Sequence, residues 1–173
     1  MLLKSVLMGF LSFHSVDTTM LKECENHADK ISGCVEKEYY ENGNLWIETP
    51  YKNGKIEGIE KWYYWNGSLR TETPYKNGRL KGIAKAYYEN GSLQAEIQFK
   101  NHGIHGDMKI YTEDKKILAL LKVENGEFIS GKCFNDRVLT DKEITDFIAS
   151  GMKDIEGPIN YLKKICLKES DSK

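Results

Sequence analysis

Residues 39–62 read YYENGNLWIETPYKNGKIEGIEKW, and residues 63–86 read YYWNGSLRTETPYKNGRLKGIAKA. These two copies of a 24-residue unit agree at 15 of 24 positions. A third copy, residues 87–110, agrees with the second at 11 positions, and residues 111–134 form a degenerate fourth copy. A constant period over this length is typical of a repeat architecture. The chain is therefore predicted to be organised around these repeats.

Each unit contains two turn signals. Counted from its leading tyrosine, Asn-Gly stands at positions 4 and 5, as in Asn66-Gly67, and again at positions 15 and 16, as in Asn77-Gly78. Asn-Gly between alternating strands favours a two-residue type I′ turn, which needs positive φ at both central residues. We therefore predict an antiparallel β-meander of hairpins that forms a single sheet, in a mainly β fold with C-terminal α-helices.

Two-residue turns also predict which side chains share a face of the sheet, because side chains alternate along a strand. One face is expected to be mostly apolar and aromatic, and in the second repeat it holds Tyr64, Leu69, Thr71, Thr73, Tyr75, Leu80, Gly82, Ala84 and Ala86. The other face is expected to be mostly charged. The same alternation places three aromatic residues on the charged face: Trp46, Tyr63 and Tyr87.

Two residue types disturb an ideal meander. Pro50 and Pro74 have no N–H to donate across the hairpin, so we expect the ladder to break or bulge there and the sheet to coil. The recurring glycine at position 20, for example Gly82, stands in the middle of a returning strand. We prefer the interpretation that it lets a neighbouring ring lie over the strand, with a bulge as the alternative.

The repeats, predicted over residues 31–134, are followed by a different pattern in residues 135–173. Thr140 and Glu143 form a capping-box signature ahead of apolar residues at helical spacing, and Pro158 is suited to open a second helix. Because solenoid ends need capping, we predict that this helix pair is a C-terminal cap. It is also expected to cover part of the apolar sheet face.

The sequence offers no enzyme signature. No G-x-S-x-G elbow, phosphate loop or H-E-x-x-H motif is present. His102 and His105 fall on opposite faces of a strand, so a shared metal is not expected. With 25 basic and 26 acidic residues, the chain also lacks the charge excess that nucleic-acid binding favours. We therefore expect no enzyme activity, no cofactor, no metal and no nucleic-acid partner.

Binding residues are better candidates. One hairpin edge gathers the cations Lys52, Lys55, Lys76 and Arg79, and the opposite edge carries Glu41, Trp65 and Glu89. The cations would suit an acidic protein or anionic lipid head groups, although charges also protect a sheet edge from aggregation. Aromatic residues on an exposed face are favoured interface anchors, although they are also packed in many proteins. Both interpretations stay open for Trp46, Tyr63 and Tyr87.

The pattern Y-Y-x-N-G-x-L followed by Y-K-N-G-(K/R)-(I/L)-x-G resembles the bacterial variant of the MORN repeat, found in YwqK-type antitoxin proteins. The resemblance covers residues 39–110 well and residues 111–134 weakly, and Lys30–Gly33 resembles half of a further copy. It implies a scaffold for protein–protein interaction, and in this group an antitoxin or immunity protein that holds a toxin inactive. Two alternatives are an exported cell-envelope protein that organises surface components and a binder of anionic lipids through the basic edge.

The N-terminal segment, residues 1–30, decides the compartment. The apolar run that starts at Val6 and ends at Phe13 resembles a secretory signal, but no clear cleavage site follows it. The alternative is a segment that covers the sheet. Four cysteines, Cys24, Cys34, Cys133 and Cys166, would form two disulfides outside the cytosol and stay as buried thiols inside it. The sequence therefore leaves open a secreted or envelope location and a cytoplasmic one.

Overall fold

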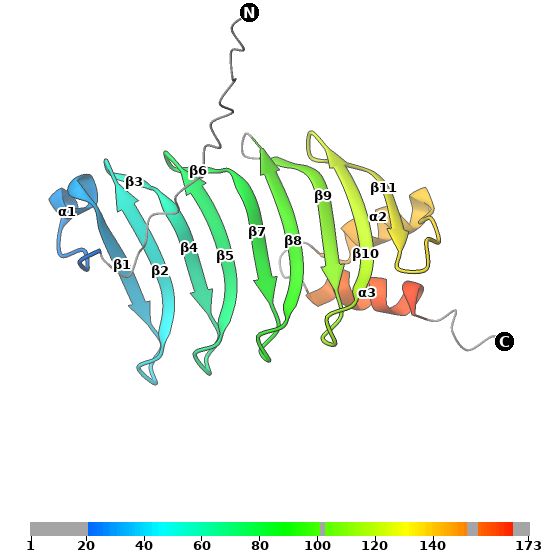
Figure 1. Ribbon diagram of the computed structural model, residues 1–173, viewed down its shortest axis with the longest axis horizontal. Helices are drawn as coiled ribbons and strands as arrows, with labels where there is room; N and C mark the ends of the chain where they lie inside the picture. The colour runs from blue at the N-terminus through cyan, green and yellow to red at the C-terminus, as the bar shows by residue number, and fades with distance from the viewer. Residues whose placement is uncertain (1–20, 101–102, 152–155, 168–173) are drawn as a thin grey trace, which may run out of the picture.

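The computed structural model describes residues 21–100, 103–151 and 156–167. They form one antiparallel sheet of eleven strands with two helices packed on one of its faces, and a short helix at the N-terminal edge (Figure 1). The strands are β1 Cys34–Tyr39, β2 Leu45–Lys52, β3 Lys55–Ile56, β4 Gly58–Tyr63, β5 Leu69–Lys76, β6 Arg79–Leu80, β7 Gly82–Tyr87, β8 Leu93–Lys100, β9 Gly103–Tyr111, β10 Ile117–Glu124 and β11 Glu127–Cys133. The helices are α1 His27–Ser32, α2 Asp141–Ala149 and α3 Glu156–Cys166.

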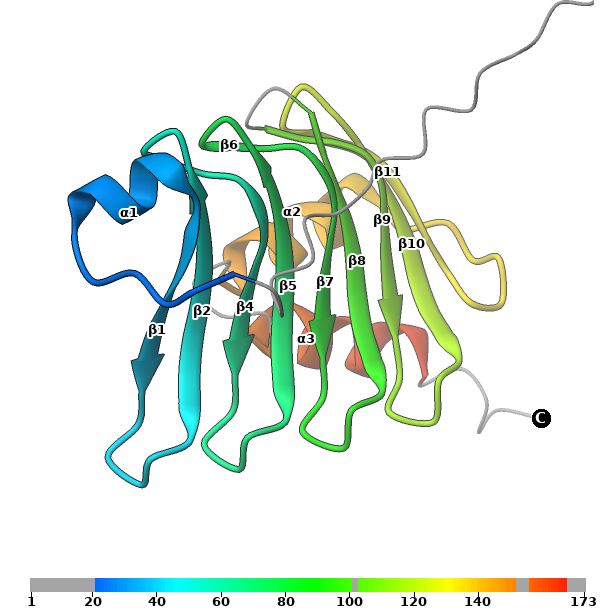
Figure 2. The same cartoon turned by 60° about the vertical axis from the view of Figure 1, so that its left-hand side comes forward.

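The strands follow the chain order, as expected for a meander. The order is β1-β2-β4-β5-β7-β8-β9-β10-β11, with β3 paired to β2 and β6 paired to β5. The predicted fold class is therefore confirmed. The expected coiling was wrong, since the sheet curves gently and its strands stay in one row (Figures 1 and 2).

The prolines break the ladder where predicted, but over a short distance. The returning strand is split opposite each proline, giving β3 and β4 in the first repeat and β6 and β7 in the second. The backbone N–H of Glu57 donates to the Pro50 carbonyl at 3.0 Å, and that of Lys81 donates to Pro74 at 3.1 Å. Where the third repeat has Gln98 instead, β9 is unbroken. Because each break is bridged at once, it does not curl the sheet.

The glycine at position 20 has a role different from the one preferred above. Gly58 and Gly82 have φ of 120° and 117°, a region that disfavours other residues. Tyr75 and Phe99 lie directly opposite them on the next strand, as a ring partner would. A side chain at Gly82 would nevertheless meet the Pro74 ring at 3.3 Å. Gly106 has φ of 111° although β9 is unbroken, so the glycine is required by the backbone conformation at position 20 with or without a break.

The two Asn-Gly sites form different turns. At positions 15 and 16, Asn77 and Gly78 both have positive φ, 53° and 76°, so the predicted type I′ turn is confirmed. At positions 4 and 5 only the glycine, such as Gly67, has positive φ. There Gly67 N–H donates to the Tyr64 carbonyl and Tyr64 N–H to the Ser68 carbonyl, which closes a three-residue loop. The predicted two-residue turn was wrong at this site.

The longer loop changes the register of the sheet. Tyr63 pairs with Leu69, and the next pair, Trp62 with Thr71, skips Arg70 as a bulge. The same bulge recurs at position 8 in the other repeats, at Trp46, Gln94 and Leu118. Because a bulge adds one residue to a strand, it moves the residues before it to the other face. Position 7 therefore joins the charged face instead of the apolar one.

The C-terminal helices form as predicted. The Thr140 hydroxyl accepts from the Glu143 N–H, and the Glu143 carboxylate accepts from the Thr140 N–H, completing the capping box. Gly151, with φ of 102°, follows the end of α2, and α3 begins at Glu156, two residues before Pro158. Both helices lie on the sheet over its C-terminal strands (Figure 2). They cover a face as well as ending the repeats.

The core lies between these helices and strands β8 to β11, with Ala86 of β7 at its edge. Its fully buried members include Ile110, Leu118 and Leu121 from the sheet, with Phe147 from α2 and Leu162 from α3. A disulfide joins Cys133 of β11 to Cys166 of α3. We call strands β8 to β11 the covered half of the sheet, and strands β1 to β7 the uncovered half.

The N-terminal end is closed differently. A disulfide joins Cys24 to Cys34 of β1, and Asn26 caps α1 by accepting from the Asp29 N–H at 3.2 Å. The Lys30 carbonyl accepts from Gly54 N–H at 2.9 Å, one position earlier in the unit than Ile56, which accepts from Gly78 N–H at 2.8 Å. The expected partial repeat at residues 30–33 keeps the glycine conformation, with φ of 117° at Gly33, but residues 30–32 belong to α1 and not to a strand such as β3. The apolar run that starts at Val6 lies outside the described residues.

Candidate functional site

Two rows of tyrosines hold the repeats together, and the first lies near the three-residue loops. The Tyr40 hydroxyl donates to the Tyr63 carbonyl at 2.7 Å, and Tyr64 donates to the Tyr87 carbonyl at 2.8 Å. Tyr88 donates to the Tyr111 carbonyl at 2.8 Å. Each tyrosine at position 2 therefore fixes its own ring and the first residue of the next repeat.

The second row lies on the charged face. The hydroxyls of Tyr63 and Tyr87 donate to Glu48 at 3.2 Å and to Glu72 at 2.7 Å. Burial raises the pKa of Tyr63 to about 12, and the Glu48 carboxylate adds to the shift. Burial and the hydrogen bond to Glu72 likewise raise the pKa of Tyr87. These two predicted interface anchors thus have structural partners within the sheet.

The recurring glutamates also contact lysines on neighbouring strands, as the sequence predicts. Lys61 pairs with Glu48 at 3.8 Å, and Lys109 pairs with Glu96 at 3.6 Å. In the register of the sheet the row alternates in sign along Lys37, Glu48, Lys61, Glu72, Lys85, Glu96 and Lys109. These carboxylates are explained by cross-strand pairing, which contributes about 0.2–1 kcal/mol per pair.

The structure separates Trp46 from Tyr63 and Tyr87. The Trp46 ring packs edge-on against Trp62 at a centroid distance of 5.9 Å and lies 6.0 Å from the Tyr40 ring. Trp62 belongs to the face that the helices cover further along the sheet. The alternation count was therefore wrong for Trp46, because this residue occupies the bulge at position 8.

The predicted basic edge does assemble. Lys52 and Lys55 flank the first type I′ turn, and Lys76 and Arg79 flank the second; all four are exposed. The two hairpins are neighbours at the edge that carries β3 and β6 (Figure 1). Glu57 adds a carboxylate there and accepts from the Asn77 N–H at 2.5 Å. The edge is a row of exposed cations.

A concave site lies on the face of the sheet that carries the helices, where this face emerges from under α2. It is a groove of about 430 Å³ along β4, β5, β7 and β8, closed at one end by Phe147 and Pro158. We call it the aromatic groove, and its floor and walls include Trp62, Thr71, Thr73, Tyr75, Leu80, Ala84, Ile97 and Phe99. All eight are half-buried, which leaves their side chains accessible from one side.

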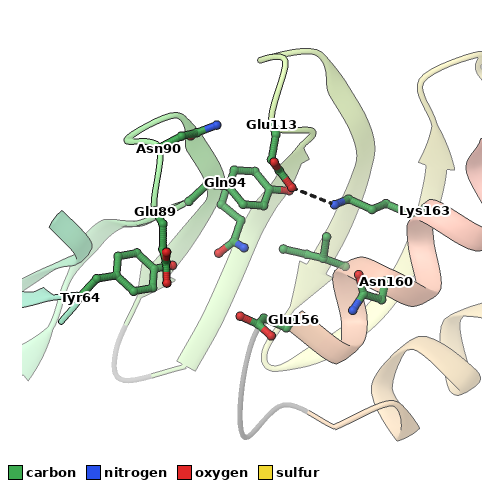
Figure 3. Close-up of a pocket in the computed structure, with 10 residues that line it drawn as sticks. Tyr64, Glu89, Asn90, Gln94, Glu113, Glu156, Asn160 and Lys163 are labelled. Carbon is green, nitrogen blue, oxygen red and sulfur yellow. Dashed lines mark ion pairs between the residues drawn. The ribbon is translucent and has the colours of Figure 1, made fainter. Parts of the chain in front are cut away.

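A second hollow adjoins it between the three-residue loops and α3. This carboxylate cleft of about 370 Å³ is lined by Tyr64, Tyr88, Glu89, Asn90, Gln94, Glu113, Glu156, Ile159, Asn160 and Lys163. Figure 3 shows the Gln94 amide in the space between Tyr64 and Glu156, with Glu113 and Lys163 to one side. Gln94 lines both hollows and so marks their boundary.

The charges of the cleft are unbalanced. It holds three carboxylates, Glu89, Glu113 and Glu156, and one ammonium group, that of Lys163. Lys163 pairs with Glu113 at 3.6 Å and lies 5.4 Å from the centre of the Tyr88 ring. Burial raises the pKa of Tyr88 to about 12, with Glu113 and Tyr64 adding to the shift. Burial also raises the pKa of Tyr64; the Arg70 guanidinium opposes this shift, and Glu89 and Glu156 add to it.

Sequence reasoning did not find this cleft. Glu89 was noted only as an edge charge, and Gln94 was not singled out. One signal was present: position 8 carries Trp46, Arg70 and Gln94 in successive repeats, so the third repeat departs from the others. The position of α3 above that repeat depends on tertiary packing and has no local signal.

Two further searches bear on function. In residues 21–100, 103–151 and 156–167, no group of three or more His, Cys, Asp or Glu side chains is placed to hold a metal ion. Within the same ranges, no helix has the length and apolar character needed to cross a bilayer.

The repeat geometry agrees with a comparison against known families. The model of the MORN repeat variant matches residues 35–53, 56–77 and 80–101. Residues 35–101 are MORN-variant repeats. The matches span β1 to β8, which includes the whole uncovered half, and stop before β9.

Comparisons with individual proteins say less. No curated protein matches the chain. Among solved structures, the chain is similar to part of the Glycosylation Associate Protein (Gap123) complex from Streptococcus agalactiae, with 15% identity and a TM-score of 0.41. That match covers 79% of this chain and 24% of the other, so the chain corresponds to about a quarter of that protein's length.

Proposed function

We propose that this MORN-variant repeat protein is a non-catalytic scaffold that binds another polypeptide along the aromatic groove. The observation that carries the proposal is the groove itself: Trp62, Tyr75 and Phe99 line one continuous hollow and stay accessible from one side. Aromatic residues in a well-formed hollow are the residues that dominate binding energy in protein interfaces. The strands already hold these side chains in place, so binding costs little of their conformational entropy.

Several features support a binding role over a catalytic one. The recurring carboxylates Glu48, Glu72 and Glu96 all accept from tyrosine hydroxyls of the next repeat. Their repetition therefore has a structural explanation. Threonines at 71 and 73 give the groove hydroxyl groups as well as apolar surface, which suits a peptide chain with both kinds of group.

The test is selection of peptides from a displayed random library with the full chain, followed by binding assays on single variants. Thr73→Arg fills the groove with a long side chain and places it opposite Glu60 on the neighbouring strand. We expect it to lower the affinity of the selected peptides at least about ten-fold, which corresponds to about 1.4 kcal/mol of binding free energy. Ile83→Arg is the matched control, because Ile83 is 51% exposed and its neighbour Ala84 lines the groove, so Ile83 points to the other face.

The outcome separates the surfaces of the molecule. If Ile83→Arg weakens the binding of the selected peptides and Thr73→Arg does not, the peptides bind the charged face and the groove proposal is overturned. Loss on neutralising Lys52 and Lys55 alone would assign binding to the basic edge instead. The finer hypothesis of an antitoxin or immunity protein rests on the repeat resemblance, and the comparisons give it no support.

A second candidate, export to the cell envelope, is favoured by the cysteines. All four are paired, as Cys24–Cys34 and Cys133–Cys166, and one pair closes each end of the sheet. Such disulfides persist in oxidising compartments. Intact mass of the protein from its native cell, measured after thiol alkylation with and without reductant, tests this. Export predicts alkylation only after reduction, whereas four alkylated thiols without reductant would place the protein in the cytosol.

A further inference from the structure

The carboxylate cleft contains a buried polar group that the fold does not use. Gln94 is 4% exposed, and its side-chain amide makes no hydrogen bond within the described residues. Because Gln94 lines the open cleft, its amide is available there to a ligand that replaces water. The amide projects into the cleft, where Figure 3 places it between Tyr64 and Glu156.

The surrounding charges define what a ligand would be. Lys163 neutralises Glu113, but Glu89 and Glu156 have no ion-pair partner in the part of the chain that the structure describes. Both carboxylates line the cleft together with the Tyr64 ring, over which the Arg70 guanidinium also lies. Two carboxylates and an amide oxygen around one opening call for a ligand with several N–H donors and a positive charge.

The tyrosine rings complete the site and offer a precedent within the molecule. The guanidinium carbon of Arg70 lies 5.6 Å from the centre of the Tyr64 ring, and Lys163 lies over the Tyr88 ring. Arg70 and Gln94 occupy the same position of successive repeats. Cations stack favourably on such rings, and a planar guanidinium does so while its edge donates to carboxylates.

We propose that the carboxylate cleft binds the guanidinium group of an arginine side chain carried by the partner polypeptide. This inference rests on the proposed function, since the partner would lie in the aromatic groove and insert its arginine past Gln94. Glu89 and Glu156 accept from the guanidinium N–H groups, the Gln94 amide oxygen accepts a further one, and the Tyr64 ring covers its plane. The partner is thus a polypeptide with an arginine next to apolar residues.

The test is a titration of the full chain with N-acetylarginine methylamide, followed by the side-chain amide signals of Gln94 in nitrogen-15 NMR spectra. We expect saturable shifts of those signals, and none with the citrulline analogue, which has the same shape without the charge. The double variant Glu89→Gln/Glu156→Gln should weaken binding at least about ten-fold, equivalent to about 1.4 kcal/mol. Glu41→Gln should not, because Glu41 holds the position of Glu89 in the first repeat but lies outside the cleft.

Four outcomes would overturn the inference. They are no binding of the capped arginine, equal binding of the citrulline analogue, equal weakening by Glu41→Gln, and agmatine binding at least about ten-fold tighter than the capped arginine. The last would assign the cleft to a free small cation. Because the capped arginine is too small to occupy the groove, its failure to bind would leave groove-dependent peptide binding standing. Loss of groove binding with intact arginine binding would reject the proposed function alone.

Discussion

The covered and uncovered halves of the sheet are built from the same hairpin unit but present different side chains on the same face. Under the helices that face holds Ala95, Met108, Ile110 and Leu121, all nearly inaccessible. On β4 and β5 of the uncovered half the corresponding surface carries threonines and aromatic rings that stay half-buried. The unit does not need the helices in order to form strands. The helices set which repeats have a closed core and which keep an accessible surface.

The difference also shows how the uncovered half is stabilised. It lacks a second layer among the described residues, yet it contains the most regular repeats. Its side-chain contacts run along the sheet: hydroxyl to carbonyl between successive tyrosines, and hydroxyl to carboxylate on the charged face. The same contacts continue into the covered half, where Tyr88 donates to the Tyr111 carbonyl and Tyr111 donates to Glu96, and burial under the helices is added to them.

The largest expected effect tests the role of burial. Phe147→Ala removes a fully buried ring that contacts Phe128 and should lower the free energy of unfolding by about 3–5 kcal/mol. Tyr75→Ala, the matched change in the uncovered half, removes a half-buried ring and should cost about 1–2 kcal/mol. Urea unfolding followed by circular dichroism measures both. Similar losses for the two variants would contradict the division into covered and uncovered halves.

A smaller effect tests the hydroxyl contacts. Tyr63→Phe removes the hydrogen bond to Glu48 and should lower stability at neutral pH by about 1 kcal/mol. Because burial raises the pKa of Tyr63 to about 12 in the folded chain, its neutral form stabilises the fold. That contribution is complete below the unfolded pKa, about 10, and is lost as pH rises toward 12. Tyr63→Phe should therefore make the alkaline loss of stability shallower.

Tyr39→Phe is the control for this experiment. Tyr39 opens the first repeat, is 52% exposed and makes no hydrogen bond through its hydroxyl within the described residues. Its substitution should change stability by less than about 0.5 kcal/mol, as surface changes usually do. Equal effects of the two substitutions would show that the tyrosine rows contribute through ring packing and not through their hydroxyls.

Much of the fold was predictable because its signals are local. The Asn-Gly pairs, the capping box at Thr140 and Glu143, and the proline breaks each depend on a few neighbouring residues. The loop at positions 4 and 5 was predicted wrongly, because the same Asn-Gly dipeptide forms a two-residue turn at one site and a three-residue loop at the other. The Asn66 side chain accepts from Ser68 N–H at 2.9 Å, which favours that loop and gives a sequence signal in the Asn-Gly-Ser triplet.

The observed loop is one residue longer than the predicted turn, and this explains why Trp46 was placed on the wrong face. The longer loop places a bulge at position 8, so Trp46 packs with Trp62 and not with Tyr63 and Tyr87. The carboxylate cleft was hidden for another reason. It combines residues of the third repeat with α3, which begins 62 residues after Gln94. A sequence pattern does not predict where such a helix comes to rest.

The tyrosine at position 2 has a consequence for how such proteins change in length. Its hydroxyl donates to a carbonyl of the next unit, as Tyr64 does to Tyr87. At the other edge the Gly78 N–H donates to the Ile56 carbonyl of the preceding unit. A whole extra copy placed between the second and third units would find both attachments ready. It would lengthen the molecule by two strand spacings, about 10 Å, with both ends unaltered. Duplication of the coding segment for one unit would therefore lengthen the sheet in fixed steps of one repeat.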